Sequence, residues 1–148
     1  MKHTLTRKHT GEEFECLNEI WDFIEIKESS IPDAGVGVFA IDNIPNNILL
    51  GWYKGFITYK AIHNAYVWNF NSDINPKKRY KLEADICTTS NPLAFVNAFK
   101  NEKEKKLHNL NKIIINDRVY YQSIKEIKKG DELIVDYESK SYFNKIKK

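Results

Sequence analysis

Short stretches in which apolar residues alternate with polar ones dominate the chain, and turn-forming residues separate them. Runs of this kind, enriched in β-branched and aromatic residues, predict β-strands. The turn segments carry Pro, Gly, Asn or Asp, each of which favours a tight turn. The pattern predicts strands at residues 23–27, 36–41, 48–57, 112–115, 119–124 and 132–137, with turns at 32–35, 45–47, 116–117 and 129–131.

Helical periodicity is scarce by comparison. Residues 11–20 place Phe14, Leu17 and Ile20 near one face and predict a short helix, and residues 60–66 are the other plausible one. Many short strands with little helix predict a mainly β domain with a few short helices, built from several small sheets.

The composition describes one folded domain. The chain has 148 residues, of which 42% are hydrophobic and 29% charged, as in a globular protein. Its purely apolar runs, such as residues 113–115, are too short to cross a membrane. The charged start has no apolar stretch behind it, so we expect no classical secretory signal.

The net charge and the positions of cysteine and histidine argue against two further classes of protein, specific nucleic-acid binders and metal-binding proteins. The net charge is +3, and only three of the 23 cationic residues are arginine, the residue that base readout in DNA favours. We therefore expect no specific nucleic-acid binding. Cys16, Cys87 and the four histidines lack metal-ligand spacing, which predicts no metal site and a reducing compartment. Residues 100–106 mix lysine with glutamate and predict a solvated loop.

A Gly35-x-Gly37 motif follows the first predicted strand and a proline-containing turn. Two glycines separated by one residue let a ligand pack against bare backbone. The third glycine of a dinucleotide site and the Gly-Lys-Ser/Thr of a P-loop are absent. Taken alone, the motif is equally compatible with a simple β-turn.

Further blocks follow this motif, at residues 50–55, 66–70, 80–84, 91–97 and 129–137. In their order and separation they resemble the SET domain of protein-lysine methyltransferases. Residues 35–40 match the family's Gly-x-Gly-x-x-Ala, residues 50–55 its Leu-Gly-x-Tyr-x-Gly, and residues 130–137 its Gly-Glu-Glu-Leu-x-x-Asp-Tyr. The resemblance covers roughly residues 23–143. It implies a SET fold, in which several small sheets surround a threaded, pseudoknot-like segment.

The departures from the family pattern point to one branch of it. Ala94 stands where the family usually has arginine, and Ala98 and Phe99 replace its His-Ser. The surrounding residues resemble the PR-type branch, which includes active methyltransferases. The missing zinc modules resemble minimal stand-alone SET proteins of viral or bacterial type. We expect an N-terminal arm at 1–21 that can include a short helix, a SET domain at 22–138 and a post-SET-like tail at 139–148.

The resemblance implies S-adenosyl-L-methionine as the cofactor. In the family this molecule lies on one face of the domain, and the substrate lysine enters by a channel from the other. The residues that would contact the cofactor are Gly35, Val36, Gly37, Tyr66, Asn97, Ala98, Tyr142 and Phe143.

The resemblance also implies the catalytic residue and the channel. Tyr137 would orient the substrate amine at the methyl-transfer site, with Tyr66, Tyr121 and Val135 lining the channel. Val135 has no hydroxyl that could hold a blocking water, so we expect more than one methyl group to be added. The three aromatic residues for which a role as channel lining competes with plain core packing are Trp68, Phe70 and Phe95.

The expected partner is a lysine-containing protein or peptide, with a histone tail as the first choice, and homodimerisation is left open. A histone substrate would place the protein in the nucleus or on host chromatin, and another substrate in the cytoplasm. Two alternatives stay open: a catalytically weak SET-derived binding or scaffold module, and a basic nucleic-acid-associated protein.

Overall fold

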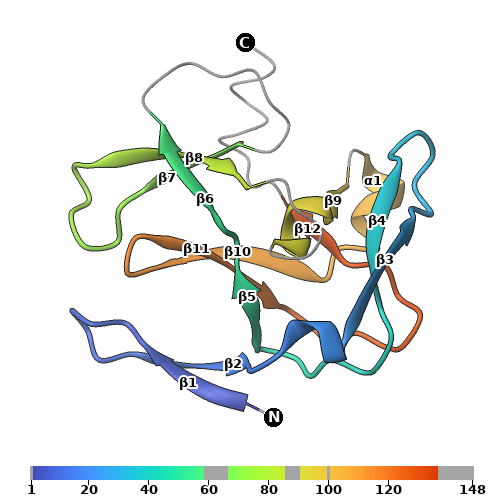
Figure 1. Ribbon diagram of the computed structural model, residues 1–148, viewed down its shortest axis with the longest axis horizontal. Helices are drawn as coiled ribbons and strands as arrows, with labels where there is room; N and C mark the ends of the chain where they lie inside the picture. Colours follow the sequence, from blue (N-terminus) through green and yellow to red (C-terminus); the bar gives the residue numbers. More distant parts are fainter. Residues whose placement is uncertain (1, 59–66, 86–90, 100, 137–148) are drawn as a thin grey trace.

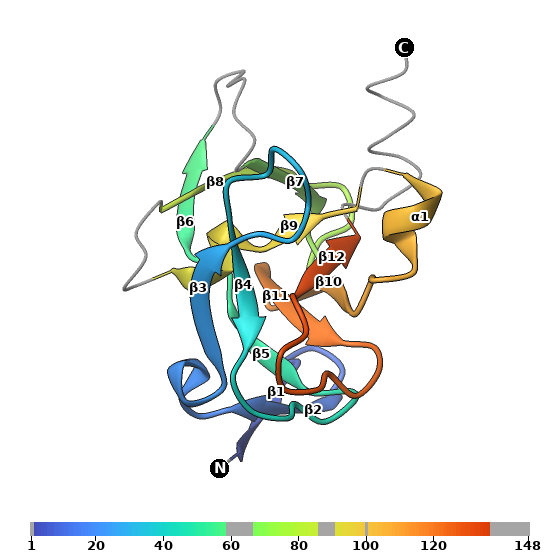
Figure 2. The same cartoon turned by 90° about the vertical axis from the view of Figure 1, so that its right-hand side faces the viewer.

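The computed structural model of the chain describes residues 2–58, 67–85, 91–99 and 101–136, and it is mainly β (Figures 1 and 2). The largest sheet has seven strands in the order β1-β2-β5-β11-β10-β12-β9. These strands are β1 (Lys2–Thr6), β2 (Glu13–Leu17), β5 (Leu49–Trp52), β9 (Asn97–Ala98), β10 (Leu110–Ile115), β11 (Arg118–Ser123) and β12 (Ile134–Asp136).

Two smaller sheets and three short helices complete the described structure. The remaining elements are η1 (Ile20–Asp22), β3 (Ile24–Glu28), β4 (Val36–Ala40), β6 (Gly55–Thr58), β7 (Val67–Asn71), β8 (Arg79–Ala84), η2 (Pro92–Phe95) and α1 (Glu102–Lys105). β3 pairs with β4, and β6, β8 and β7 form a three-stranded sheet in that order. One hydrophobic cluster includes side chains from all three sheets and forms the main core. The predicted mainly β class with several small sheets is confirmed.

The predicted helix at residues 11–20 is wrong. β1 and β2 form an antiparallel hairpin instead, and β2 joins the large sheet by pairing with β5. Burial along β2 alternates with period two, because Phe14 and Cys16 face the core while Glu13 and Glu15 face solvent. Pairing with β1 and β5 therefore overrides the helical spacing of the apolar residues. The N-terminal arm contains a hairpin and the 3-10 helix η1 rather than an α-helix.

Other local expectations differ in detail. The strand expected at 48–57 is divided into β5 and β6, because the chain passes at residues 53–54 from the large sheet to the three-stranded one. The expected loop at 100–106 contains the solvent-exposed turn α1, which Asn101 caps by accepting a hydrogen bond from the Glu104 N–H. The expected helix at 60–66 lies outside the described residues.

β12 is threaded between two strands that precede it in the chain. It pairs in parallel with β9 on one side and with β10 on the other. The connection from β9 to β10, which contains α1, must therefore pass across β12 (Figure 2). The buried Asn109 holds the crossing: its amide donates to the Glu132 carbonyl and accepts from the Ile134 N–H, at 2.9 and 2.8 Å. This is the threaded segment that the resemblance implied.

The N-terminal hairpin is fixed to the rest of the protein by a largely buried ion pair. The Arg7 guanidinium lies 2.6 Å from the Asp73 carboxylate, in the loop between β7 and β8. The backbone N–H groups of Asn116 and Asp117, in the turn between β10 and β11, also donate to Asp73. Burial acts to raise the pKa of Asp73, but these hydrogen bonds and that from Arg7 outweigh it, so the pKa lies below its usual value.

This network predicts acid sensitivity. A carboxyl whose pKa is lowered in the folded state stabilises the fold above its unfolded pKa of about 3.9, and this contribution is lost as the pH falls through the folded value. We expect Asp73→Asn to lower the free energy of unfolding at pH 6, and the difference from wild type to shrink below about pH 4. Urea unfolding across pH measures it, with the exposed Asp22→Asn as control. A pH-independent difference would contradict the assignment.

No helix in the described part of the chain is long and apolar enough to cross a membrane.

Candidate functional site

The Gly35-x-Gly37 motif lies at the start of β4, next to two side chains from distant parts of the chain. Asn97, at the start of β9, donates from Nδ2 to the Val36 carbonyl at 3.1 Å and to Glu132 Oε2 at 3.2 Å. Glu132 lies two residues before the start of β12. The fold thus brings two predicted cofactor-binding segments, residues 35–37 and Asn97, into direct contact.

Glu132 is buried, with 8% of its surface exposed to solvent. Its Oε1 accepts hydrogen bonds from the Ser30 N–H at 3.0 Å and the Ser30 hydroxyl at 2.6 Å. Its Oε2 accepts from the Ser29 hydroxyl at 2.7 Å as well as from Asn97. A carboxylate has about four acceptor positions, and here four donors occupy them. Glu132 therefore ties the turn before the glycine motif to β9.

The two glycines serve different purposes. Gly35 has a φ of +75°, a conformation that side chains disfavour, while the space around its missing Cβ is open. At Gly37 the limit is space: an added Cβ would lie 2.3 Å from Glu132 Oε2 and 3.1 Å from Asn97 Nδ2. The sequence argument assigned Gly37 to close approach by a ligand. The structure shows that the direction of its side chain is filled by the protein's own Glu132 and Asn97.

β12 lies between β9, which contains the predicted cofactor residues Asn97 and Ala98, and β10. On one side Val135 is the partner of Ala98 in β9, and on the other side it is the partner of Leu110 in β10. Val135 is fully buried. The last described residue of the strand is Asp136, which precedes Tyr137 in the sequence.

A buried aromatic cluster, formed by Tyr53, Trp68 and Tyr121, lies in the main core together with Val135. The Trp68 indole N–H donates to the Tyr121 hydroxyl at 3.0 Å, and the two rings meet edge to face with centroids 6.1 Å apart. The Tyr53 ring lies 5.5 Å from that of Tyr121. The ammonium of Lys112, the cross-strand partner of Tyr121, lies 4.3 Å from the centre of the Trp68 ring. Of the residues predicted to line the channel, Tyr121 belongs to this cluster and Val135 lies in the same core.

The structure separates the other aromatic candidates. Phe70 packs against Tyr80, with ring centroids 5.6 Å apart, and Phe95 is a partly buried residue of η2 against the main core. Of the three aromatic residues with two competing roles, Trp68 is the one in ring contact with Tyr121. The predicted site residues Tyr66, Tyr137, Tyr142 and Phe143 lie outside the described residues.

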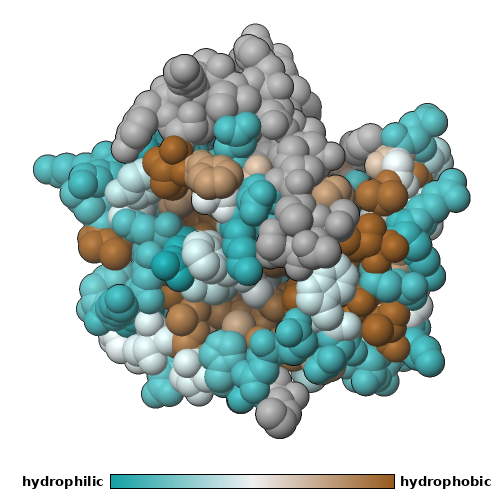
Figure 3. Space-filling model, in the orientation of Figure 1, coloured by the Kyte–Doolittle hydropathy of each residue, from teal (hydrophilic) through white to brown (hydrophobic). Residues whose placement is uncertain are grey.

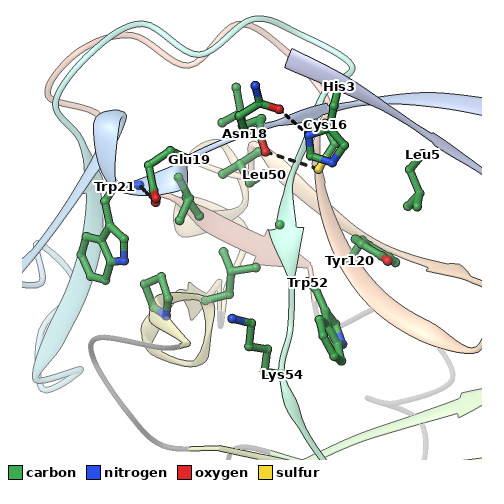
Figure 4. Close-up of a pocket in the computed structure, with 15 residues that line it drawn as sticks. His3, Leu5, Cys16, Asn18, Glu19, Trp21, Leu50, Trp52, Lys54 and Tyr120 are labelled. Atoms are coloured by element: carbon green, nitrogen blue, oxygen red, sulfur yellow. Dashed lines mark hydrogen bonds between the residues drawn. The ribbon is translucent and has the colours of Figure 1, made fainter. Parts of the chain in front are cut away.

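A shallow groove of about 470 Å³ lies elsewhere, between the N-terminal hairpin, η1, β5 and η2 (Figure 4). Leu17, Leu50 and Leu93 contribute to its lining, with Trp21 and Trp52 from different elements. Cys16 also lines it, but burial raises the pKa of this thiol and so disfavours the nucleophilic thiolate. Among the predicted cofactor and channel residues that the structure describes, none lines this groove.

Sequence reasoning missed three residues of the candidate site. Glu132 was part of a recognised block, but no pattern in the sequence assigns its carboxylate to Ser29 and Ser30, about a hundred residues away. Tyr53 could have been found, because its block contains a tyrosine of the family pattern. Lys112 carried no signal: within an apolar strand, a lysine normally indicates a solvent-facing position.

Comparison with known proteins agrees with this geometry. Residues 24–148 match the family of the PR domain of PR domain zinc finger protein 2. The chain is 34% identical over 122 residues to "Histone-lysine N-methyltransferase set-17" of Caenorhabditis elegans, covering 80% of this chain and 42% of that protein. The chain thus spans less than half the length of this curated relative.

Solved structures share the fold. The methyltransferase domain of human PR domain-containing protein 2 superposes with a TM-score of 0.64 at 24% identity, over 79% of this chain and 78% of that one. The Neurospora SET domain protein DIM-5, a histone lysine methyltransferase, gives a TM-score of 0.59 at 20% identity, over 79% and 52%. With the family match over most of its length, the threaded β12 and the Gly35-x-Gly37 motif against Asn97, this chain belongs to the PR-domain branch of the SET family and is a homologue of histone-lysine methyltransferases.

Proposed function

We propose that the protein is an S-adenosylmethionine-dependent protein-lysine N-methyltransferase that acts on a histone tail. The observation that carries the proposal is the convergence on β12. The predicted cofactor residues Asn97 and Ala98 flank this strand on one side, β10 flanks it on the other, and β12 leads directly to Tyr137. A methyl donor and a lysine amine bound on the two sides would meet near its end.

The residues suit methyl transfer between two bound groups. When bound, S-adenosylmethionine supplies an electrophilic methyl group on a positively charged sulfur. The lone pair of the neutral lysine nitrogen would form the new N–C bond as the C–S bond breaks. The electron pair of the C–S bond would stay on sulfur, and the methylated nitrogen would lose a proton to water. Positioning provides most of the rate enhancement in such an in-line displacement. Surrounding the amine with buried aromatic rings such as Tyr53, Trp68 and Tyr121 favours its neutral form.

An extended peptide needs a free strand edge, because main-chain pairing then provides affinity and side-chain pockets provide selectivity. β6 is an edge strand of the three-stranded sheet and starts two residues after Tyr53. It exposes Phe56, at 66%, and Ile57. On the face shown in Figure 3, hydrophobic surface occurs in separate patches among hydrophilic residues. We propose β6 as the edge that receives the substrate peptide, and nuclear or host chromatin as the place where a histone is met.

Three experiments test the proposal: calorimetry, methylation of candidate substrates and DNA binding across a salt series. Calorimetry with S-adenosylmethionine asks whether the protein binds the cofactor, which a SET-derived scaffold need not do. Incubation of the protein with nucleosomes or cell lysate and labelled cofactor, followed by mass spectrometry, identifies the methylated lysine. Cofactor binding without any methylated product would favour the scaffold. The replacement of the family's His by Ala98 supports that alternative. Salt-dependent DNA binding without cofactor binding would favour a nucleic-acid-associated protein.

The product is expected to carry more than one methyl group. Val135 precedes Tyr137 by two residues, is fully buried and has no hydrogen-bond donor for a water that would block a second transfer. The alternative is that the hydroxyl of Tyr120 or Tyr121 does the blocking: Tyr120 packs in the second core cluster with Phe14 and Leu49, whereas Tyr121 shares the main core with Val135. A time course on the preferred peptide, followed by mass spectrometry, should show dimethyl product.

The matched variant for this prediction is Val135→Thr, which keeps the approximate shape of valine and replaces one methyl group by a hydroxyl. We expect it to raise the fraction of monomethyl product. Accumulation of monomethyl product alone in the wild type, after exhaustive incubation, would exclude the role given to Val135. Unfolding of each variant, monitored by circular dichroism, shows whether the hydroxyl disturbs the core.

A further inference from the structure

The partly exposed side chain of Asn97 uses only the nitrogen end of its amide in hydrogen bonds with the described part of the protein. Two groups lie within hydrogen-bond distance of its Nδ2, the Val36 carbonyl and the Glu132 carboxylate, and both are acceptors. The nitrogen must therefore face them, because the amide oxygen in the same place would meet two other oxygens. Within the described part of the chain, no hydrogen bond to Asn97 Oδ1 is present. The outward group of Asn97 is thus an acceptor.

Glu132 is itself held in one orientation. Each carboxylate oxygen accepts two hydrogen bonds, from Ser30 on Oε1 and from Ser29 and Asn97 on Oε2. The Ser29 hydroxyl accepts in turn from the Ile31 N–H at 3.0 Å, so its proton is directed to the carboxylate. None of the ion pairs found among the described residues involves Glu132. Hydrogen bonds from a short turn, rather than a cation, keep this charge in place.

We propose that Glu132 is a positioning residue that fixes the Asn97 amide with its oxygen outward, as the acceptor for an N–H donor of S-adenosylmethionine. The inference rests on the proposed function. It adds the residue that determines which end of the Asn97 amide is presented to the cofactor. Glutamate is required because its carboxylate only accepts. A side chain that also donates would let the Asn97 amide turn over, and the outward group would become a second donor facing the donor groups of the ligand.

Glutamine at position 132 makes this requirement testable. Its amide has the same shape but one oxygen and one nitrogen. If the nitrogen faces Ser30, it meets the Ser30 N–H, a donor that cannot accept. If the nitrogen faces Asn97, it meets the donating Nδ2, and the Asn97 amide must flip. Neither orientation satisfies all the partners that the carboxylate satisfies.

We therefore expect Glu132→Gln to raise the dissociation constant for S-adenosylmethionine at least about tenfold, measured by calorimetry. The matched control is Asp131→Asn, the exposed neighbour whose carboxylate accepts from the Lys128 N–H and contacts neither Ser29, Ser30 nor Asn97 in the described structure; its affinity should equal that of wild type. A double-mutant cycle with Asn97→Ala separates positioning from general damage, because coupled residues are not additive. In the Asn97→Ala background, Glu132→Gln should have little further effect. An equal loss in both backgrounds would overturn the proposal.

A second measurement is independent of the cofactor and of folding losses. In the ligand-free protein, NMR should show the Asn97 side-chain NH₂, assigned by its absence in Asn97→Ala, protected from solvent exchange, and unprotected in Glu132→Gln. Fast exchange in the wild type would overturn the orientation. If the wild type binds no S-adenosylmethionine, the proposed function and the ligand in this inference both fail, while the NMR result still decides whether Glu132 orients Asn97.

Discussion

Replacing Gly37 by alanine or valine is expected to weaken S-adenosylmethionine binding at least about tenfold, or ~1.4 kcal/mol, and to destabilise the fold by about 1–3 kcal/mol. The reason is the position of the missing Cβ. An added carbon 2.3 Å from Glu132 Oε2 and 3.1 Å from Asn97 Nδ2 must displace both side chains. These side chains hold the turn before β4 and the amide proposed to bind the cofactor. The effect reaches the ligand through the protein's own groups, and alanine is therefore sufficient.

Calorimetry and thermal unfolding of the same samples measure the two effects. Gly11→Ala is the control for loss of a glycine without a close contact: Gly11 has a positive φ, +77°, open space around its Cβ position, and a place in the β1–β2 turn. This control should lose some stability and keep full cofactor affinity. A Gly37→Ala variant with wild-type stability and affinity would show that the contact with Glu132 does not limit this position.

The parts of the fold that the sequence predicted are those in which local pattern and tertiary environment agree. β4, β10 and β11 follow alternating or apolar runs and end at turns of suitable chemistry. The turn at residues 116–117 illustrates this agreement, because Asn116 and Asp117 both adopt positive φ, as a tight hairpin requires.

Where the two disagree, the sequence reading failed. Phe14, Leu17 and Ile20 fit a helical face, but Phe14 and Cys16 belong to a strand whose partners, β1 and β5, are fixed by pairing at a distance. β7 and β8 were recognised as motif blocks without a structural assignment. Such errors are expected, because strand formation depends on neighbours that a short window of sequence does not contain.

The candidate site divides in the same way. The positions of Gly37, Asn97 and Tyr121 follow from motif spacing, since each stands in a block with a recognisable pattern. The function of Glu132 could not be predicted, because its four hydrogen bonds depend on Ser29, Ser30 and Asn97, which only the threaded topology brings together. The explanation for Gly37 differs from the predicted one for the same reason. A sequence shows that a glycine is present, but not whether a ligand or the protein itself fills the space beside it.

Replacing Tyr137 by phenylalanine is expected to lower turnover at least about tenfold, equivalent to ~1.4 kcal/mol of transition-state stabilisation. The substitution removes only the hydroxyl proposed to orient the substrate amine. An ordinary tyrosine has a pKa of about 10, which makes this group an orienting hydrogen-bond partner rather than a strong base. Because the loss is confined to the transition state, kcat should fall while the dissociation constant for S-adenosylmethionine stays unchanged.

Tyr80→Phe provides the comparison for this variant. Tyr80 is a half-buried tyrosine that packs on Phe70 and has no proposed part in the chemistry. The Tyr80→Phe variant should keep wild-type kcat. A tenfold loss of kcat in Tyr137→Phe alone would then show that the effect depends on the position of this hydroxyl and is not caused by removing any tyrosine hydroxyl. Initial rates with saturating cofactor and peptide give kcat, and calorimetry gives the affinity. Near wild-type turnover of Tyr137→Phe would remove Tyr137 from the mechanism. The lysine would then have to be oriented by the aromatic cluster of Tyr53, Trp68 and Tyr121, in which the Trp68 indole N–H donates to the Tyr121 hydroxyl.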